Sequence, residues 1–135
     1  MSGGTMNTGM GTSAATATDE TGDLIASDKV EGTAVYNRQG ERMGTVKDFM
    51  VNKRSGQVAY AVMSFGGFLG IGESFHPLPW KVLAYDTGKG GYVVDLTRQQ
   101  LEGAPAYTSS DLPDWSTPDY GRRVSGYYGM PYAGI

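Results

Sequence analysis

The chain lacks cysteine, has a single histidine and has few basic side chains. Without a thiolate it cannot form a disulfide, a cysteine-ligated zinc site, an iron–sulfur cluster or a cysteine nucleophile. One imidazole, that of His76, excludes metal sites built from several histidines. Eleven basic residues against fourteen acidic ones give a net charge of −3 and a pI of about 5.0, the wrong sign for neutralising phosphates. We therefore expect no metal, no cofactor and no nucleic-acid partner.

The sequence also lacks a long apolar segment. No stretch approaches the roughly 20 apolar residues of a transmembrane helix. The first 23 residues contain neither lysine nor arginine, and they lack the apolar run that a secretory signal requires. We therefore expect a soluble, cytoplasmic protein without a transmembrane segment.

Glycine, in contrast, is abundant, with 21 of 135 residues, and composition divides the chain into three regions. Residues 1–23 consist mostly of Gly, Ser, Thr, Ala and Met. Such a segment buries too little apolar surface to offset about 1–2 kcal/mol of backbone entropy per ordered residue, so we expect a disordered tail. Residues 24–104 carry the folded domain. Residues 105–135 form an aromatic-rich extension, called the C-terminal strap below.

Short segments rich in Val, Tyr, Phe and Met follow one another between residues 24 and 104, separated by turn signals about every ten residues. This pattern is typical of a small all-β barrel or sandwich. The predicted strands, arranged as a meander, are 33–36, 43–51, 57–65, a prolyl edge segment within 73–80, 82–85 and 92–96. A short helix at 98–102 is predicted by Thr97 and Gln100, which have the spacing of a capping box.

Strand 57–65 is apolar on both faces. Alternation places Val58, Tyr60 and Val62 on one face, and Ala59, Ala61, Met63 and Phe65 on the other. A small barrel fills its interior with one face of each strand. The second face must therefore meet the helix, the C-terminal strap or another molecule.

The C-terminal strap contains aromatic side chains that each bury a large area. Its aromatic residues are Tyr107, Trp115, Tyr120, Tyr127, Tyr128 and Tyr132. Their spacing in a turn-rich segment favours a strap that lies on a preformed surface, and the alternative is a solvated tail.

Three motifs together resemble the PRC-barrel family. They are Arg-Met-Gly-Thr-Val-Lys-Asp-Phe at 42–49, the strand at 57–65 running into Gly-Gly-Phe-Leu-Gly at 66–70, and Pro-Leu-Pro-Trp at 77–80. The resemblance covers roughly residues 24–104. It implies a small, highly bent β-barrel of about six strands, the fold of the cytoplasmic domain of the reaction-centre H subunit and of a domain of a ribosome maturation factor. No functional residue of either relative can be matched onto a position in this chain.

The glycine-rich segments at 66–72 and 86–91 do not have the context of a phosphate-binding loop. A P-loop and a dinucleotide-binding loop both open a helix, whereas here Glu73 with two prolines, or a strand, follows. We interpret residues 66–72 as a barrel corner and residues 86–91 as a hairpin turn. His76 shares a strand face with Ser74 and lies near Glu73, but no nucleophile elbow surrounds the serine. We therefore predict no catalytic residue, and we expect the chain not to be an enzyme.

The remaining clusters of charged residues in the sequence contain only two or three residues each. Asp111, Asp114 and Asp119 lack the alternating spacing of a calcium loop. The basic pairs Lys53-Arg54 and Arg122-Arg123 are each too small to form a nucleic-acid groove.

Apolar surface therefore remains as the candidate functional feature. The favoured hypothesis is a non-enzymatic interaction or scaffold module that forms a homo-oligomer or docks a protein partner. The predicted interaction surface comprises Phe65, Phe68, Leu69, Ile71, Trp115, Tyr127 and Tyr128. One alternative, implied by the resemblance, is a soluble accessory factor in membrane electron transfer or ribosome assembly. Another is a small-molecule-binding or enzymatic site around His76 and Glu73.

Overall fold

The computed structural model describes residues 24–65 and 73–132. The predicted disordered tail at 1–23 and the predicted barrel corner at 66–72 lie outside the described residues. The described elements are α1 (Ser27–Val30), β1 (Ala34–Asn37), β2 (Arg42–Val51), β3 (Val58–Phe65), β4 (Ser74–Pro79), the 3₁₀ turn η1 (Trp80–Val82), β5 (Ala84–Asp86), β6 (Gly91–Val94), α2 (Arg98–Glu102) and α3 (Pro118–Tyr127).

Six strands form one open sheet in the order β4-β3-β2-β1-β6-β5. Strands β1 to β4 pair with their neighbours in sequence in antiparallel fashion, as a meander does. The last two strands depart from the predicted meander. Strand β6 pairs with β1 in parallel, and β5 pairs with the other side of β6 at the edge of the sheet. The sheet therefore has the all-β, barrel-like architecture expected from the sequence, but its two edge strands, β4 and β5, do not pair with each other.

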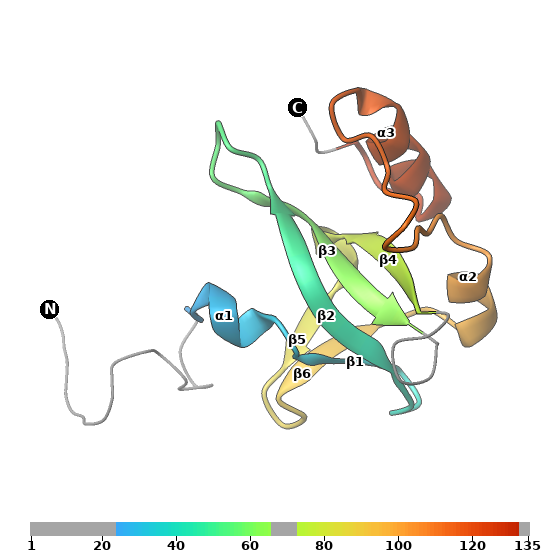
Figure 1. Cartoon of the computed structure of the whole chain (residues 1–135). Helices are drawn as coiled ribbons and strands as arrows, with labels where there is room; N and C mark the ends of the chain where they lie inside the picture. Colours follow the sequence, from blue (N-terminus) through green and yellow to red (C-terminus); the bar gives the residue numbers. More distant parts are fainter. Residues whose placement is uncertain (1–23, 66–72, 133–135) are drawn as a thin grey trace, which may run out of the picture.

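Strand β2 bends the sheet. It pairs with β1 at its beginning and with β3 along most of its length, and its register shifts at two places, between Val46 and Asp48 and between Met50 and Val51. Such bulges increase the local bend and twist of a strand. In Figure 1, β5 and β6 lie behind the long β2–β3 hairpin.

The main core lies between the two halves of this bent sheet. On the β3 side it contains Ala61, Met63 and Phe65, together with Leu78 of β4. The opposite half and the flanking helices supply a second set, all of them at most 5% exposed: Val30, Val35, Tyr92, Val94 and Leu101. The face of β3 that carries Ala61, Met63 and Phe65 therefore points into the main core, and Phe65, which the sequence analysis placed on the interaction surface, is buried there.

Helix α2 begins where the sequence predicts. The Thr97 side chain accepts a hydrogen bond from the backbone N–H of Gln100, and the Gln100 side chain accepts one from the backbone N–H of Thr97. This reciprocal pair satisfies two N–H groups that the first turn of a helix leaves without partners. The buried side chain of Leu101 then anchors the helix to the core.

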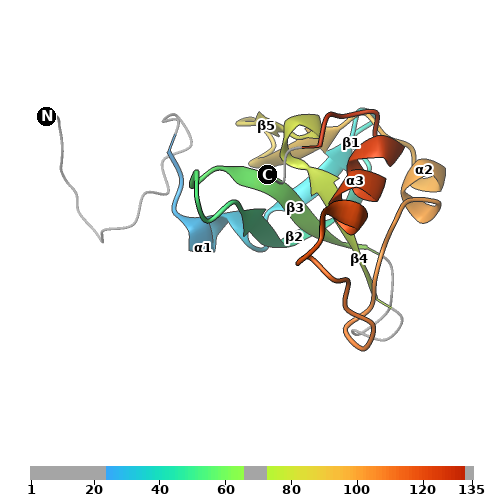
Figure 2. The same ribbon diagram turned by 90° about the horizontal axis from the view of Figure 1, so that it is seen from above.

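The C-terminal strap contains a ten-residue helix, α3, that the sequence reasoning missed. Pro118 occupies the first turn, where its missing N–H is not needed. The helix buries Gly121, Val124 and Ser125, so small side chains form much of its inward face. Figures 1 and 2 show α3 lying beside β4. Its contacts with Tyr60 place it on the face of β3 opposite Ala61 and Met63, away from the main core.

Candidate functional site

The second face of β3, defined here as Tyr60, Val62 and Ser64 with their β4 partners Phe75, Pro77 and Pro79, meets the C-terminal strap. Directly opposed residues of antiparallel strands share a face, and the register pairs Tyr60 with Pro79, Val62 with Pro77 and Ser64 with Phe75. Val62 is 1% exposed, and Val124 of α3 is 0% exposed. Of the covers that the sequence left open for this face, the structure uses the strap of the same chain.

Tyr60 holds α3 against the sheet. Its hydroxyl donates to the Gly121 carbonyl over 3.1 Å and lies 3.0 Å from the Ser125 hydroxyl, and the whole arrangement is buried. A β-carbon at Gly121 would lie 3.0 Å from the Tyr60 hydroxyl oxygen and closer still to the Tyr132 ring, so glycine permits this approach. Burial raises the pKa of Tyr60, which therefore stays protonated and able to donate.

Aromatic contacts extend the strap across the same face. The Trp115 ring lies 5.5 Å from that of Tyr60 and 5.0 Å from that of Tyr120, centroid to centroid. At the free edge of β4, Phe75 and Tyr107 exchange two backbone hydrogen bonds of 2.8 and 3.0 Å. The strap therefore pairs with the sheet at one end and packs on it at the other.

The residues of the predicted interaction surface differ in how far they are buried. Phe65 is 6% exposed and faces the main core, and Trp115 is half-buried between Tyr60 and Tyr120. Tyr127 is 44% exposed, and its ring contacts that of the half-buried Tyr128. Phe68, Leu69 and Ile71 lie outside the described residues. The structure thus brings Tyr127 and Tyr128 together and buries Phe65, while Trp115 stays partly exposed.

An apolar concavity that the sequence analysis did not single out opens at the end of the β2–β3 hairpin. It has a volume of about 520 Å³. We call this concavity the hairpin groove. Its lining residues are Asn52, Ser55, Gln57, Val58, Ala59, Pro79, Trp80, Lys81, Met130, Pro131 and Tyr132. A smaller hollow of about 130 Å³ adjoins it, shares Asn52, Ala59 and Tyr132, and adds the 46% exposed side chain of Val51.

The Ser74–His76 pair does not have the arrangement of a nucleophile and its base. The Ser74 hydroxyl donates its only proton to the Phe65 carbonyl over 3.0 Å. His76 Nε2, 3.0 Å from the same oxygen, must therefore be the donor to Ser74. In a catalytic pair the serine donates to the imidazole. Glu73 accepts from Ser64 instead of contacting the imidazole.

His76 is a neutral core residue. It is 2% exposed, its ring packs edge-on against Phe65 at 5.2 Å, and its Nδ1 atom is buried without a hydrogen-bond partner. Burial lowers the pKa of His76 below its ordinary value, because the protonated ring would be poorly solvated there.

Three charged side chains of the strap have partners nearby. Asp114 accepts hydrogen bonds from Ser116, which lowers the pKa of that carboxyl group. The guanidinium groups of Arg122 and Arg123 lie over the rings of Tyr132 and Tyr120, at 5.4 and 5.1 Å.

Within residues 24–65 and 73–132, no group of three or more His, Cys, Asp or Glu side chains is placed to hold a metal ion. Among the helices of this part of the chain, none is long and apolar enough to cross a membrane.

The Tyr60 contact yields a test of strap docking. Tyr60→Phe keeps the ring but removes the hydroxyl that serves both Gly121 and Ser125. We expect a loss of about 1–3 kcal/mol in the free energy of unfolding, measured by urea denaturation, because buried polar groups lose their partner. The matched control is Tyr36→Phe on β1, whose ring contact with Lys89 does not need the hydroxyl. Equal effects of the two changes would contradict the role given to Tyr60.

The burial of His76 yields a pH dependence. Because the pKa of His76 is lowered by folding, the unfolded chain binds this proton first as the pH falls. The part of the free energy of unfolding that depends on a neutral His76 is fully present above pH 6.5. It is lost as the pH falls from 6.5 toward the pKa of His76 in the folded state. We expect the free energy of unfolding to fall between pH 6.5 and 5 by a fraction of the roughly 1.4 kcal/mol per pH unit that complete titration gives.

The control for this dependence is His76→Gln, whose amide can still donate to Ser74 but does not titrate. The pH slope of the wild type should exceed that of the variant over this interval, as measured by urea denaturation at each pH. Identical slopes would show that His76 is not the group responsible.

Two known proteins resemble the chain in part. An uncharacterized protein from Deinococcus radiodurans is 26% identical over 93 residues, which cover 69% of this chain and 33% of that protein. The chain thus spans about a third of the length of that relative. A solved structure from Pseudomonas aeruginosa, of a protein described as a 16S ribosomal RNA processing protein, aligns at a TM-score of 0.36 and 18% identity, over 57% of this chain and 48% of its own.

The family itself is shown by the match to its sequence profile. The profile of the PRC-barrel domain matches residues 22–101, more than half of the chain and nearly all of the segment from α1 through α2. The three motifs that carry the resemblance in the sequence lie within that match. The chain therefore belongs to the PRC-barrel domain family.

Proposed function

We propose that this chain is a cytoplasmic, non-enzymatic interaction module that associates with a second copy of itself through the hairpin groove. The observation that carries the proposal is the groove, an apolar concavity of about 520 Å³ bordered by the exposed strand end at Val51. Lys81 is the only charged residue in its lining. Seven of its eleven lining residues are apolar or aromatic, and a concavity with a mostly apolar lining is the usual form of a binding site.

The groove is favoured over the second face of β3 because that face is already buried. Tyr60 and Val62 are 2% and 1% exposed beneath the strap. A partner could reach them only after breaking the Tyr60 hydrogen bonds and the Trp115 contacts. The groove, in contrast, is open while the strap is docked, and Met130, Pro131 and Tyr132 of the strap form one of its walls.

The chemistry of the polar groups supports a non-enzymatic role. The Ser74 proton is directed at a backbone carbonyl, and the His76 imidazole is buried in the core. No contact among the described residues favours the accessory roles in electron transfer or ribosome assembly that the resemblance implies. The proposal is therefore limited to association.

A charge placed at the groove should weaken self-association. Val51→Lys puts an ammonium group on an exposed strand end, so the fold should survive, but the contact between copies would have to desolvate a charge. Sedimentation velocity at tens of micromolar should show the wild type as a dimer or larger, and the variant as predominantly monomeric. The expected weakening of the dissociation constant is about tenfold or more.

The matched control is Leu112→Lys, which charges a 70% exposed apolar side chain of the strap that lines neither the groove nor the adjoining hollow. It should associate as the wild type does. A monomeric wild type at this concentration, or equal behaviour of the two lysine variants, would contradict the proposal.

A further inference from the structure

Two adjacent apolar side chains at the start of the described residues lack cover. Leu24 is 84% exposed, the most of any large apolar side chain in the described part of the chain, and Ile25 is 41% exposed. Both precede α1, whose Val30 enters the main core. Single exposed apolar residues are common on protein surfaces, but this pair also adjoins a run of acidic residues.

The acidic residues lie directly before the apolar pair. They are Asp19, Glu20 and Asp23, and the first basic residue of the chain is Lys29. We call residues 19–25 the acidic segment. It combines three carboxylates with two apolar side chains and contains no cation. A complementary site for it must therefore be apolar with a basic border.

The hairpin groove has this combination. Lys81 is the only charged residue of its mostly apolar lining. Lys53 and Arg54 lie in the turn of the β2–β3 hairpin, next to lining residues, and the Arg122 guanidinium lies 5.4 Å from the ring centroid of Tyr132 in the groove wall. The ion pairs of the described residues involve none of these cations. Four basic side chains therefore border an apolar floor.

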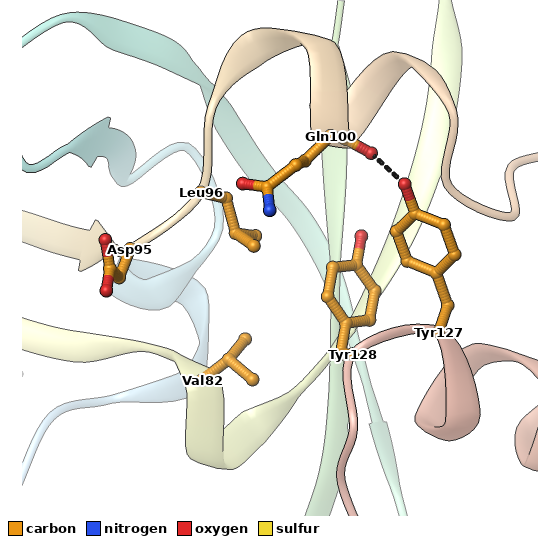
Figure 3. A pocket seen from close by; sticks show the side chains of 6 residues that line it. All are labelled: Val82, Asp95, Leu96, Gln100, Tyr127 and Tyr128. Carbon is orange, nitrogen blue, oxygen red and sulfur yellow. Dashed lines mark hydrogen bonds between the residues drawn. The ribbon is translucent and has the colours of Figure 1, made fainter.

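A second cavity does not match the acidic segment. It has a volume of about 300 Å³ and lies between α2 and the end of α3, where the Tyr127 hydroxyl donates to the Gln100 carbonyl over 2.6 Å. Its only charged lining residue, Asp95, stands at one side of the cavity in Figure 3 and is itself acidic. Juxtaposed like charges disfavour binding, so the hairpin groove is the better match.

Within one chain, the acidic segment lies away from the groove. Backbone hydrogen bonds join Gly32 and Thr33, just after α1, to Val46 in the middle of β2, whereas the groove begins beyond the end of that strand. Figures 1 and 2 both show α1 well separated from α3. Neither Leu24 nor Ile25 lines the groove. The groove of one copy is therefore open to the segment of another.

We propose that the hairpin groove of one copy binds the acidic segment of a second copy. Leu24 and Ile25 lie on the apolar floor, and the carboxylates of the segment face the basic border. This inference rests on the proposed self-association and names the surface of the second copy that takes part in it. Because the two surfaces differ, a reciprocal exchange of segments between two copies fills both grooves of a dimer.

The acidic residues of the strap favour one direction for the bound segment. Asp114 and Asp119 lie close in sequence to Trp115 and Gly121, which line the smaller hollow and not the groove. The carboxylates of the segment should therefore lie at the end of the groove formed by Lys81 and the hairpin turn, away from the smaller hollow.

A double variant, Leu24→Ser with Ile25→Ser, tests the segment in the full chain. Both side chains are exposed, so the fold should survive. Sedimentation velocity at tens of micromolar should show the double variant as predominantly monomeric, with a dissociation constant weakened by about tenfold or more, as expected when buried apolar side chains are removed. The matched control is Leu112→Ser, which removes another exposed leucine and should associate as the wild type does.

A double variant that associates as the wild type does, while Val51→Lys does not, would overturn this inference and leave the proposed self-association standing. The groove would then bind a different surface of the second copy.

A peptide of residues 17–27 tests the contact directly. The peptide contains no aromatic residue, whereas Trp80 lines the groove, so tryptophan fluorescence reports on the protein alone. Titrated into the double variant, the peptide should change this fluorescence saturably, and its affinity should fall as NaCl is raised from about 50 to about 500 mM. The same peptide with serine at positions 24 and 25 should not bind. Failure of the wild-type peptide to bind at millimolar concentration would overturn the inference, whatever the association state of the full chain.

Charge reversal at the border locates the peptide. Lys81→Glu, made in the double variant, should weaken peptide binding about two- to fivefold at low salt, because an attractive charge becomes repulsive. Lys89→Glu reverses an exposed lysine of the β5–β6 turn, outside the lining, and should leave the affinity unchanged. Equal effects of the two reversals would refute the assignment of the segment to this groove.

Discussion

The need to bury both faces of β3 shapes the rest of this structure. One face, carrying Ala61, Met63 and Phe65, is satisfied when the sheet bends over itself at the bulges of β2. The other face, carrying Tyr60 and Val62, would remain exposed on a barrel of this size. The C-terminal strap supplies the missing layer, so residues beyond the family match complete the packing of the central strand.

The same constraint explains where the open surfaces lie. Once the strap occupies the second face, concavities lie along its borders. The hairpin groove lies between the strap's last described residues and the β2–β3 hairpin, and another cavity lies between Tyr128 of the strap and α2. Neither could be found from one element alone, because each is formed by residues far apart in the sequence.

Much of the barrel could be predicted from the sequence because its signals are local. Strand limits follow from apolar alternation between turns, and the structure shifts them by no more than about two residues. The start of α2 follows from Thr97 and Gln100, whose side chains act on backbone groups within one turn. The burial of both faces of β3 follows from its composition, since neither face carries a charged side chain.

The rest depends on weaker or longer-range signals. Helix α3 contains Gly121, Ser125 and Gly126, which have poor intrinsic helix propensity, so tertiary packing against Tyr60 outweighs the local preference. Pro118 at the first turn, with Tyr120, Val124 and Tyr128 four residues apart, was the available signal. The parallel pairing of β1 with β6 joins segments more than 50 residues apart, and no local pattern specifies it.

The central claim is that the strap is an integral layer of the fold, covering the second face of β3 within one chain. Comparing the full chain with one that ends at residue 104, by urea denaturation, tests it most directly. If the claim holds, the shorter chain has a lower free energy of unfolding, because Tyr60, Val62 and Phe75 lose their cover and become exposed. Unchanged stability would contradict it.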